Sequence, residues 1–172
     1  LERDEHRAAI VTNRPSLPLE GFGTPEAEIG AEGVGLEQVP LVGYGDMLWL
    51  SALRDVDVLR LRKPSPVHVL AALLWVVDFE QEAALHHAAE LALSGTAIPL
   101  WQEFDGAEMT MFEDTTAGLK SALAAKDVLE HAGVAIELRL IGISEAPSKR
   151  SALEATGAQV YSELGLALHS LM

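Results

Sequence analysis

The sequence predicts a three-layer α/β fold, in which helices cover both faces of a mostly parallel β-sheet. Short apolar runs typical of buried strands alternate along the chain with longer segments of helical periodicity. Such alternation indicates βαβ units and hence a parallel sheet. The length of 172 residues and the hydrophobic content of 49% suit one domain over residues 1–172 with its own core.

Five segments are expected to form strands, because each is a short apolar or alternating run that ends at a turn signal. They cover residues 8–11, 56–61, 108–112, 135–143 and 159–161. The first ends ahead of Pro15, which disfavours helical backbone at the residue before it. The second stops at the sequence Lys-Pro-Ser-Pro of residues 63–66.

Helical periodicity, together with start and stop residues, predicts the helices. They cover residues 47–53, 67–77, 81–94, 116–131, 148–156 and 162–171, with a shorter helix near 25–29. Asp46 and Ser65 can each act as an N-cap, and Gly95 and Gly133 follow the ends of two of these helices. Residues 16–45 are rich in Gly, Pro and Glu and are expected to be mostly loop, and residues 16–55 are expected to form a loop insertion or a small cap.

The charge balance excludes several classes of partner. The chain carries 26 Asp and Glu residues against 12 Lys and Arg residues, for a formal net charge of −14. This surface repels phosphate backbones and anionic lipid, so we expect no nucleic-acid partner and no membrane partner. Cysteine is absent, which excludes disulfides and thiolate zinc sites and fits a reducing compartment. We therefore expect a cytoplasmic protein.

Groups suited to phosphate chemistry follow three of the predicted strands. They are Thr12, Lys63 and the adjacent acids Glu113 and Asp114. Ligands of parallel α/β sheets bind at the carboxyl ends of the strands, so we expect these groups to form one site. A hydroxyl, an ammonium and two carboxylates suit a phosphoryl group with Mg²⁺, because Mg²⁺ prefers carboxylate oxygen and lysine neutralises phosphate.

The same residues carry a resemblance to the haloacid dehalogenase-like (HAD) hydrolases. Residues 63–66 before an apolar helix resemble the lysine motif of this family, and residues 10–13, Ile-Val-Thr-Asn, resemble its threonine motif. Residues 112–118, Phe-Glu-Asp-Thr-Thr-Ala-Gly, resemble its acidic motif as found in the phosphoglycolate phosphatase and β-phosphoglucomutase branch. The resemblance implies a Rossmann-like core and a Mg²⁺-dependent phosphatase that acts on a small phosphorylated metabolite through an aspartyl-phosphate.

The resemblance also implies a role for each matching residue. Thr12 would bind the transferring phosphoryl group, and Asn13 would contact phosphate or substrate. Lys63 would hold the nucleophile and the phosphate together. Asp114, with Glu113, would bind Mg²⁺ directly or through water.

The aspartate nucleophile of the family belongs to a D-x-D motif, and the residues before Thr12 contain no such motif. The chain starts at Leu1 and not at methionine, so we expect it to be the C-terminal portion of a longer protein. The missing portion would supply the nucleophile and would be a partner of this chain, which alone would be inactive. Asp78 lies in the nearest look-alike, residues 75–80, which follows the lysine motif and overlaps a predicted helix, so we do not assign it as the nucleophile. The alternative is a catalytically silent HAD-like domain that binds or interacts only.

Simpler interpretations of these residues stay open. Glu113 and Asp114 can be acids that favour a helix N-terminus, and Lys63 can be a solvated lysine at the end of a strand. His86 and Glu90 are one helical turn apart, and we interpret them as an exposed helix face and not as metal ligands.

Overall fold

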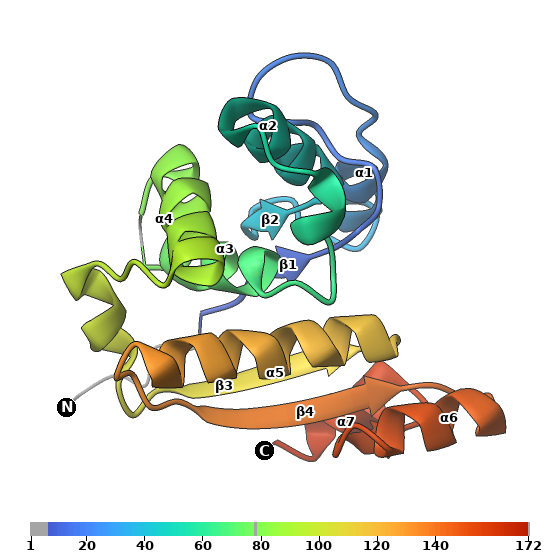
Figure 1. The fold of residues 1–172 in the computed structure, drawn as a ribbon. Coiled ribbons are helices and arrows are strands. Elements are labelled where there is room, and N and C mark those ends of the chain that lie inside the picture. Colours follow the sequence, from blue (N-terminus) through green and yellow to red (C-terminus); the bar gives the residue numbers. More distant parts are fainter. Residues whose placement is uncertain (1–6, 78, 172) are drawn as a thin grey trace, which may run out of the picture. The chain divides into compact units, whose positions relative to one another are not determined.

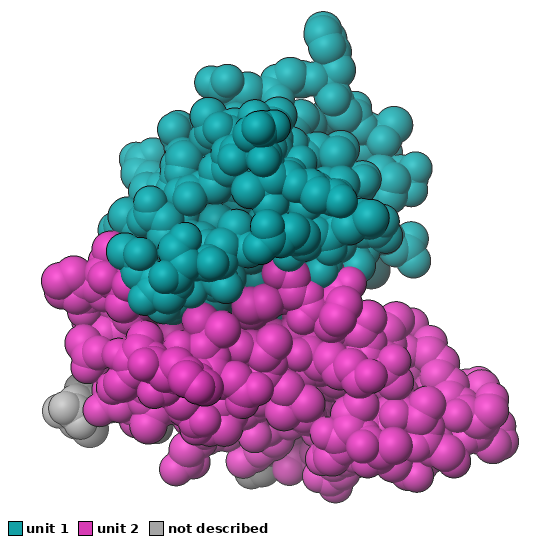
Figure 2. Space-filling model, in the orientation of Figure 1, with its two compact units in different colours: residues 1–62, 67–96 teal, residues 63–66, 97–172 magenta. Residues whose placement is uncertain are grey.

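The computed structural model describes residues 7–77 and 79–171 of the chain. The chain divides into two compact units, Leu1–Arg62 with Val67–Thr96 and Lys63–Pro66 with Ala97–Met172 (Figure 2). Both units combine helices with parallel strands, so the predicted α/β class is confirmed. The single domain expected over residues 1–172 stays a prediction. Among the described residues, no helix has the length and apolar character that crossing a membrane requires.

The first unit is built around α3 and a short two-stranded parallel sheet. Its elements are β1 (Ile10–Val11), α1 (Glu26–Glu32), β2 (Leu41–Val42), α2 (Tyr44–Arg54), the 3₁₀ helix η1 (Val58–Arg60), α3 (Val67–Trp75) and α4 (Gln81–Ser94) (Figure 1). Ile10 pairs with Leu41 in the sheet. The helix α3 contacts both strands and α4, and it is apolar nearly all round, as expected of a buried helix.

The second unit is a three-stranded parallel sheet with the order β3-β4-β5. Its elements are the 3₁₀ helix η2 (Pro99–Phe104), β3 (Glu108–Glu113), α5 (Thr116–His131), β4 (Glu137–Ile143), α6 (Pro147–Glu154), β5 (Gln159–Tyr161) and α7 (Leu164–His169) (Figure 1). The helices α5 and α6 connect successive strands and contact each other and β4, as right-handed crossovers on one face require. Its core includes fully buried Leu119, Ile141 and Leu153.

The register of this sheet brings two helix starts to one edge. Glu113 at the end of β3 lies opposite Gly142 near the end of β4. The helices α5 and α6 begin shortly after these two strands, so their first turns lie at the same carboxyl edge. This is the edge at which ligands of parallel sheets bind.

Two local predictions are wrong. The segment 56–61 is not a strand but contains η1, because the Asp57 side chain accepts a hydrogen bond from the Leu59 N–H at 2.9 Å and stabilises a turn. Asp46 is not the N-cap of α2 but lies inside its first turn, where its carboxylate accepts from the Gly43 N–H at 2.9 Å. In contrast, α4, α5 and β5 have the predicted bounds.

Candidate functional site

Lys63 and Glu113 form a nearly buried ion pair in the second unit. The Lys63 ammonium donates to Glu113 Oε1, and the two side chains are only 6% and 9% exposed. Charges buried to this degree are costly without a partner, so removing either side chain would leave the other as an uncompensated buried charge. The sequence predicts that Lys63 follows the end of a strand. In the structure it follows η1 through a turn instead.

The Glu113 carboxylate lies against the first turn of α5. Thr115, the N-cap of α5, donates its hydroxyl to Glu113 Oε2 at 3.1 Å and accepts from the Gly118 N–H at 3.1 Å. A Cβ atom at Gly118 would overlap the Glu113 carboxylate. Only glycine therefore lets the carboxylate approach the helix this closely, where the positive end of the helix dipole also favours it.

The next residue, Asp114, has a different environment from Glu113. The Asp114 side chain is 65% exposed, and its Oδ2 accepts from the Lys149 ammonium at 2.8 Å. Lys149 lies in the first turn of α6, which starts just beyond the end of β4. The pairing of β3 with β4 therefore explains how two residues 35 positions apart come into contact.

The two carboxylates at this edge differ in their access to a cation from solvent. Asp114 is open to solvent, whereas both oxygens of Glu113 already accept hydrogen bonds from Lys63 and Thr115. Within residues 7–77 and 79–171, no group of three or more metal-ligating side chains occurs. Mg²⁺ does not require one, since one or two carboxylates together with phosphate and water commonly hold it. Asp114 is thus the candidate direct ligand, and Glu113 the candidate for a contact through water.

Thr12 and Asn13 belong to the first unit. Thr12 directly follows β1, and its backbone N–H donates to the Val42 carbonyl at 3.0 Å. The Thr12 hydroxyl accepts from the Arg14 N–H at 3.0 Å, which fixes the turn after the strand. Their joint site with Lys63 stays a prediction, and Asp78 lies outside the described residues.

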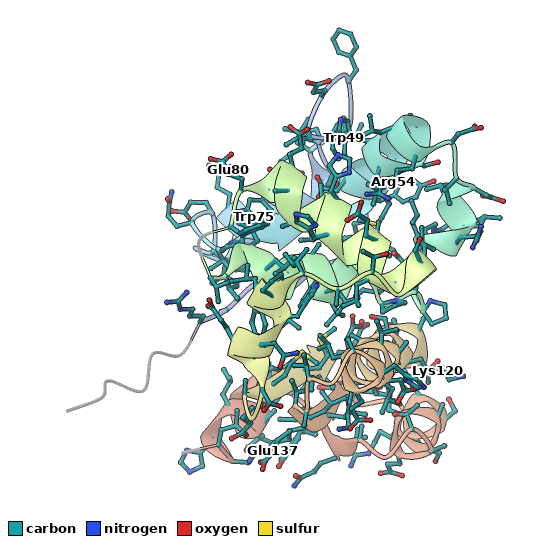
Figure 3. The ribbon with its side chains drawn as sticks, turned by 60° about the vertical axis from the view of Figure 1, so that its left-hand side comes forward. Trp49, Arg54, Trp75, Glu80, Lys120 and Glu137 are labelled. Atoms are coloured by element: carbon teal, nitrogen blue, oxygen red, sulfur yellow. The ribbon has the colours of Figure 1, made fainter. Side chains whose placement is uncertain are left out.

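The helix α4 carries a second polar cluster, in the first unit. Arg54 of α2, labelled in Figure 3, contacts His86 Nδ1 at 3.0 Å, the His86 carbonyl at 3.1 Å and Glu90 Oε1 at 3.3 Å. His87 Nδ1 lies 3.4 Å from Glu90 Oε2. These side chains thus link α2 to α4, which accounts for the pair His86 and Glu90 without a metal ion.

The sequence analysis includes Thr115 and Gly118 in the acidic motif without giving them a role, and it misses Lys149 as part of the site. Lys149 had a usable signal, since it opens a helix after the predicted strand 135–143 and so belongs to the same carboxyl edge. The role of Gly118 had none, because it depends on where the Glu113 carboxylate lies. Comparisons of the chain with protein-family models, curated proteins and solved structures found no match.

Proposed function

We propose that this chain is part of a HAD-like, Mg²⁺-dependent phosphatase that hydrolyses a small phosphorylated metabolite. The buried ion pair between Lys63 and Glu113 carries the proposal. This pair joins the segment that resembles the family's lysine motif to the segment that resembles its acidic motif, 50 residues further along the chain. A solvated lysine or a simple helix-capping acid would need no such buried partner.

Each predicted site residue has a distinct task in the proposal. Glu113 holds Lys63 in place, and the Lys63 ammonium attracts and neutralises the substrate phosphate. Asp114 would hold Mg²⁺, which when bound supplies further positive charge for the phosphoryl oxygens. The hydroxyl of Thr12 would donate a hydrogen bond to one phosphoryl oxygen, and Asn13 would contact phosphate or substrate.

The reaction has two steps in this proposal. An aspartate carboxylate outside residues 1–172 attacks phosphorus, the bond from phosphorus to the alcohol oxygen breaks, and an aspartyl-phosphate forms. Water then hydrolyses this acyl phosphate, which releases inorganic phosphate and restores the carboxylate. In the described part of the chain, β1 and β3 each pair with one strand only, so each has an edge to which a parallel strand carrying this aspartate can add.

The test uses the protein in its full natural length and a generic aryl phosphate as substrate. We expect hydrolysis with Mg²⁺, none with excess chelator, and none in the Asp114→Asn variant at any Mg²⁺ concentration. Asp127→Asn is the matched control, because it removes the same charge from an exposed position of α5 and should retain activity. Full activity in chelator or in Asp114→Asn would overturn the proposal.

A catalytically silent HAD-like binding domain is the second candidate. The observation that favours it is that a lysine already neutralises each of the two carboxylates at this edge. This candidate predicts that the full-length protein binds inorganic phosphate or Mg²⁺ without turnover of any phosphate monoester. For the chain of residues 1–172 alone, both candidates predict negligible turnover, so only the full-length protein separates them.

A further inference from the structure

The carboxylate that is most open to a metal ion already has a cation beside it. Lys149 donates to Asp114 Oδ2 at 2.8 Å, and the two side chains are 43% and 65% exposed. Lys63, in contrast, is enclosed together with Glu113. Lys149 can therefore leave its carboxylate and remain hydrated, whereas Lys63 cannot do so at a comparable cost.

The position of Lys149 on α6 gives a second, independent reason for its contact with Asp114. The first turn of a helix carries a partial positive charge, which is unfavourable for an ammonium group. Asp114 compensates this repulsion, so the pair persists although it is exposed. An exposed pair is nevertheless weak and screened by salt, and a divalent cation can replace the lysine at the carboxylate.

We propose that Lys149 is a tethered counter-ion of Asp114, which Mg²⁺ must displace in order to bind. The inference rests on the proposed function in one respect, that Asp114 is a Mg²⁺ ligand. Lys149 would then weaken Mg²⁺ binding and raise the Mg²⁺ concentration at which the site fills. In the absence of the metal, it would keep the exposed carboxylate neutralised at the edge where an anionic substrate is expected.

The test measures the Mg²⁺ dissociation constant of the full-length protein from the rise of its thermal unfolding midpoint with Mg²⁺ concentration. Lys149→Met should bind Mg²⁺ about two- to fivefold more tightly than the unmodified chain, which corresponds to the loss of one exposed ion pair. Lys149→Arg keeps the charge and should bind Mg²⁺ as the unmodified chain does. Lys120→Met, on the exposed side of α5 (Figure 3), is the control for bulk charge and should change the affinity less than twofold.

The outcomes separate this inference from the proposed function. Binding of Mg²⁺ by the unmodified chain but not by Asp114→Asn would support Asp114 as the metal ligand. If Lys149→Met then binds Mg²⁺ no more tightly than the unmodified chain, the counter-ion role of Lys149 is refuted while the assignment of Asp114 is retained. An equal gain in Lys149→Met and Lys120→Met would refute it too, since the effect would then be one of net charge. If Asp114→Asn binds Mg²⁺ as well as the unmodified chain, the metal assignment fails and this inference fails with it.

Discussion

Replacing Gly118 with alanine has two opposite effects on the stability of the folded chain. Gly118 is the third residue of α5, and alanine is favoured over glycine in a helix by about 1 kcal/mol. The added Cβ, however, would overlap Cδ and both oxygens of the Glu113 side chain. The carboxylate must therefore leave its position against the helix.

The steric effect should exceed the gain in helix propensity. Inserting a methyl group into a filled site costs about 1–3 kcal/mol. Moving the Glu113 carboxylate also separates it from Lys63, and breaking a buried ion pair costs about 3–5 kcal/mol. The lower ends of these ranges, reduced by the helix gain, leave a net loss of about 3 kcal/mol in the free energy of unfolding.

Urea unfolding of Gly118→Ala, followed by circular dichroism, tests this estimate. Gly165→Ala is the matched control, because Gly165 lies in α7 of the same unit and a Cβ there meets no atom within 4 Å. The control should be unchanged or more stable by up to about 1 kcal/mol. If Gly118→Ala is as stable as the unmodified chain, the Glu113 carboxylate does not lie against the first turn of α5, and the structure of the site is refuted.

Two further predictions concern the first unit. Burial raises the pKa of Asp46 from 3.8 to about 6, against the hydrogen bonds from Gly43 and Gln81. The folded chain therefore retains this proton to higher pH than the unfolded chain, and the free energy of unfolding should fall by about 2 kcal/mol between pH 4 and pH 6. Asp46→Asn should flatten this slope in urea unfolding at a series of pH values, and an unchanged slope would contradict the assignment. Arg54→Met should lower the free energy of unfolding by about 1–2 kcal/mol, because it removes charged hydrogen bonds between α2 and α4. Since the hydrogen bond from Arg54 lowers the pKa of Glu90, that pKa should rise toward its ordinary value in the variant, as followed by NMR titration.

The sequence predicts the elements best where the signals are local and the segments long. The bounds of α4 and α5 follow from 14 and 16 residues of helical pattern, respectively. Gly95, in the left-handed conformation, ends α4, and Thr115 is the N-cap at the start of α5. The strand β2 has two residues within a Gly- and Pro-rich segment, which is too short for any periodicity to register. The segment 56–61 alternates as a strand does, but the hydrogen bond of Asp57 to the backbone outweighs that pattern.

The charged residues Lys63 and Glu113 could be predicted from the sequence, but the contacts around them could not. Lys63 and Glu113 are identified by short motifs, and they meet across 50 residues in the structure. The contact of Asp114 with Lys149 depends on which residues of β3 and β4 pair, and the sequence does not give that register. The close approach of Glu113 to Gly118 depends likewise on a side-chain position that no sequence pattern encodes.

The two adjacent acids differ because of where the strand ends. Glu113 is the last residue of β3, whereas Asp114 lies in the bend between β3 and α5, and the two side chains have different environments. Glu113 turns toward the first turn of α5 and is enclosed with Lys63, whereas Asp114 faces solvent and the exposed Lys149. An enclosed pair exchanges partners only at a high desolvation cost, and an exposed pair exchanges them cheaply. Under the proposed function, exchange of a lysine for a metal ion would therefore be open to Asp114 and closed to Glu113, so that one acid would hold a cation for the phosphate while its neighbour would be available to a second cation.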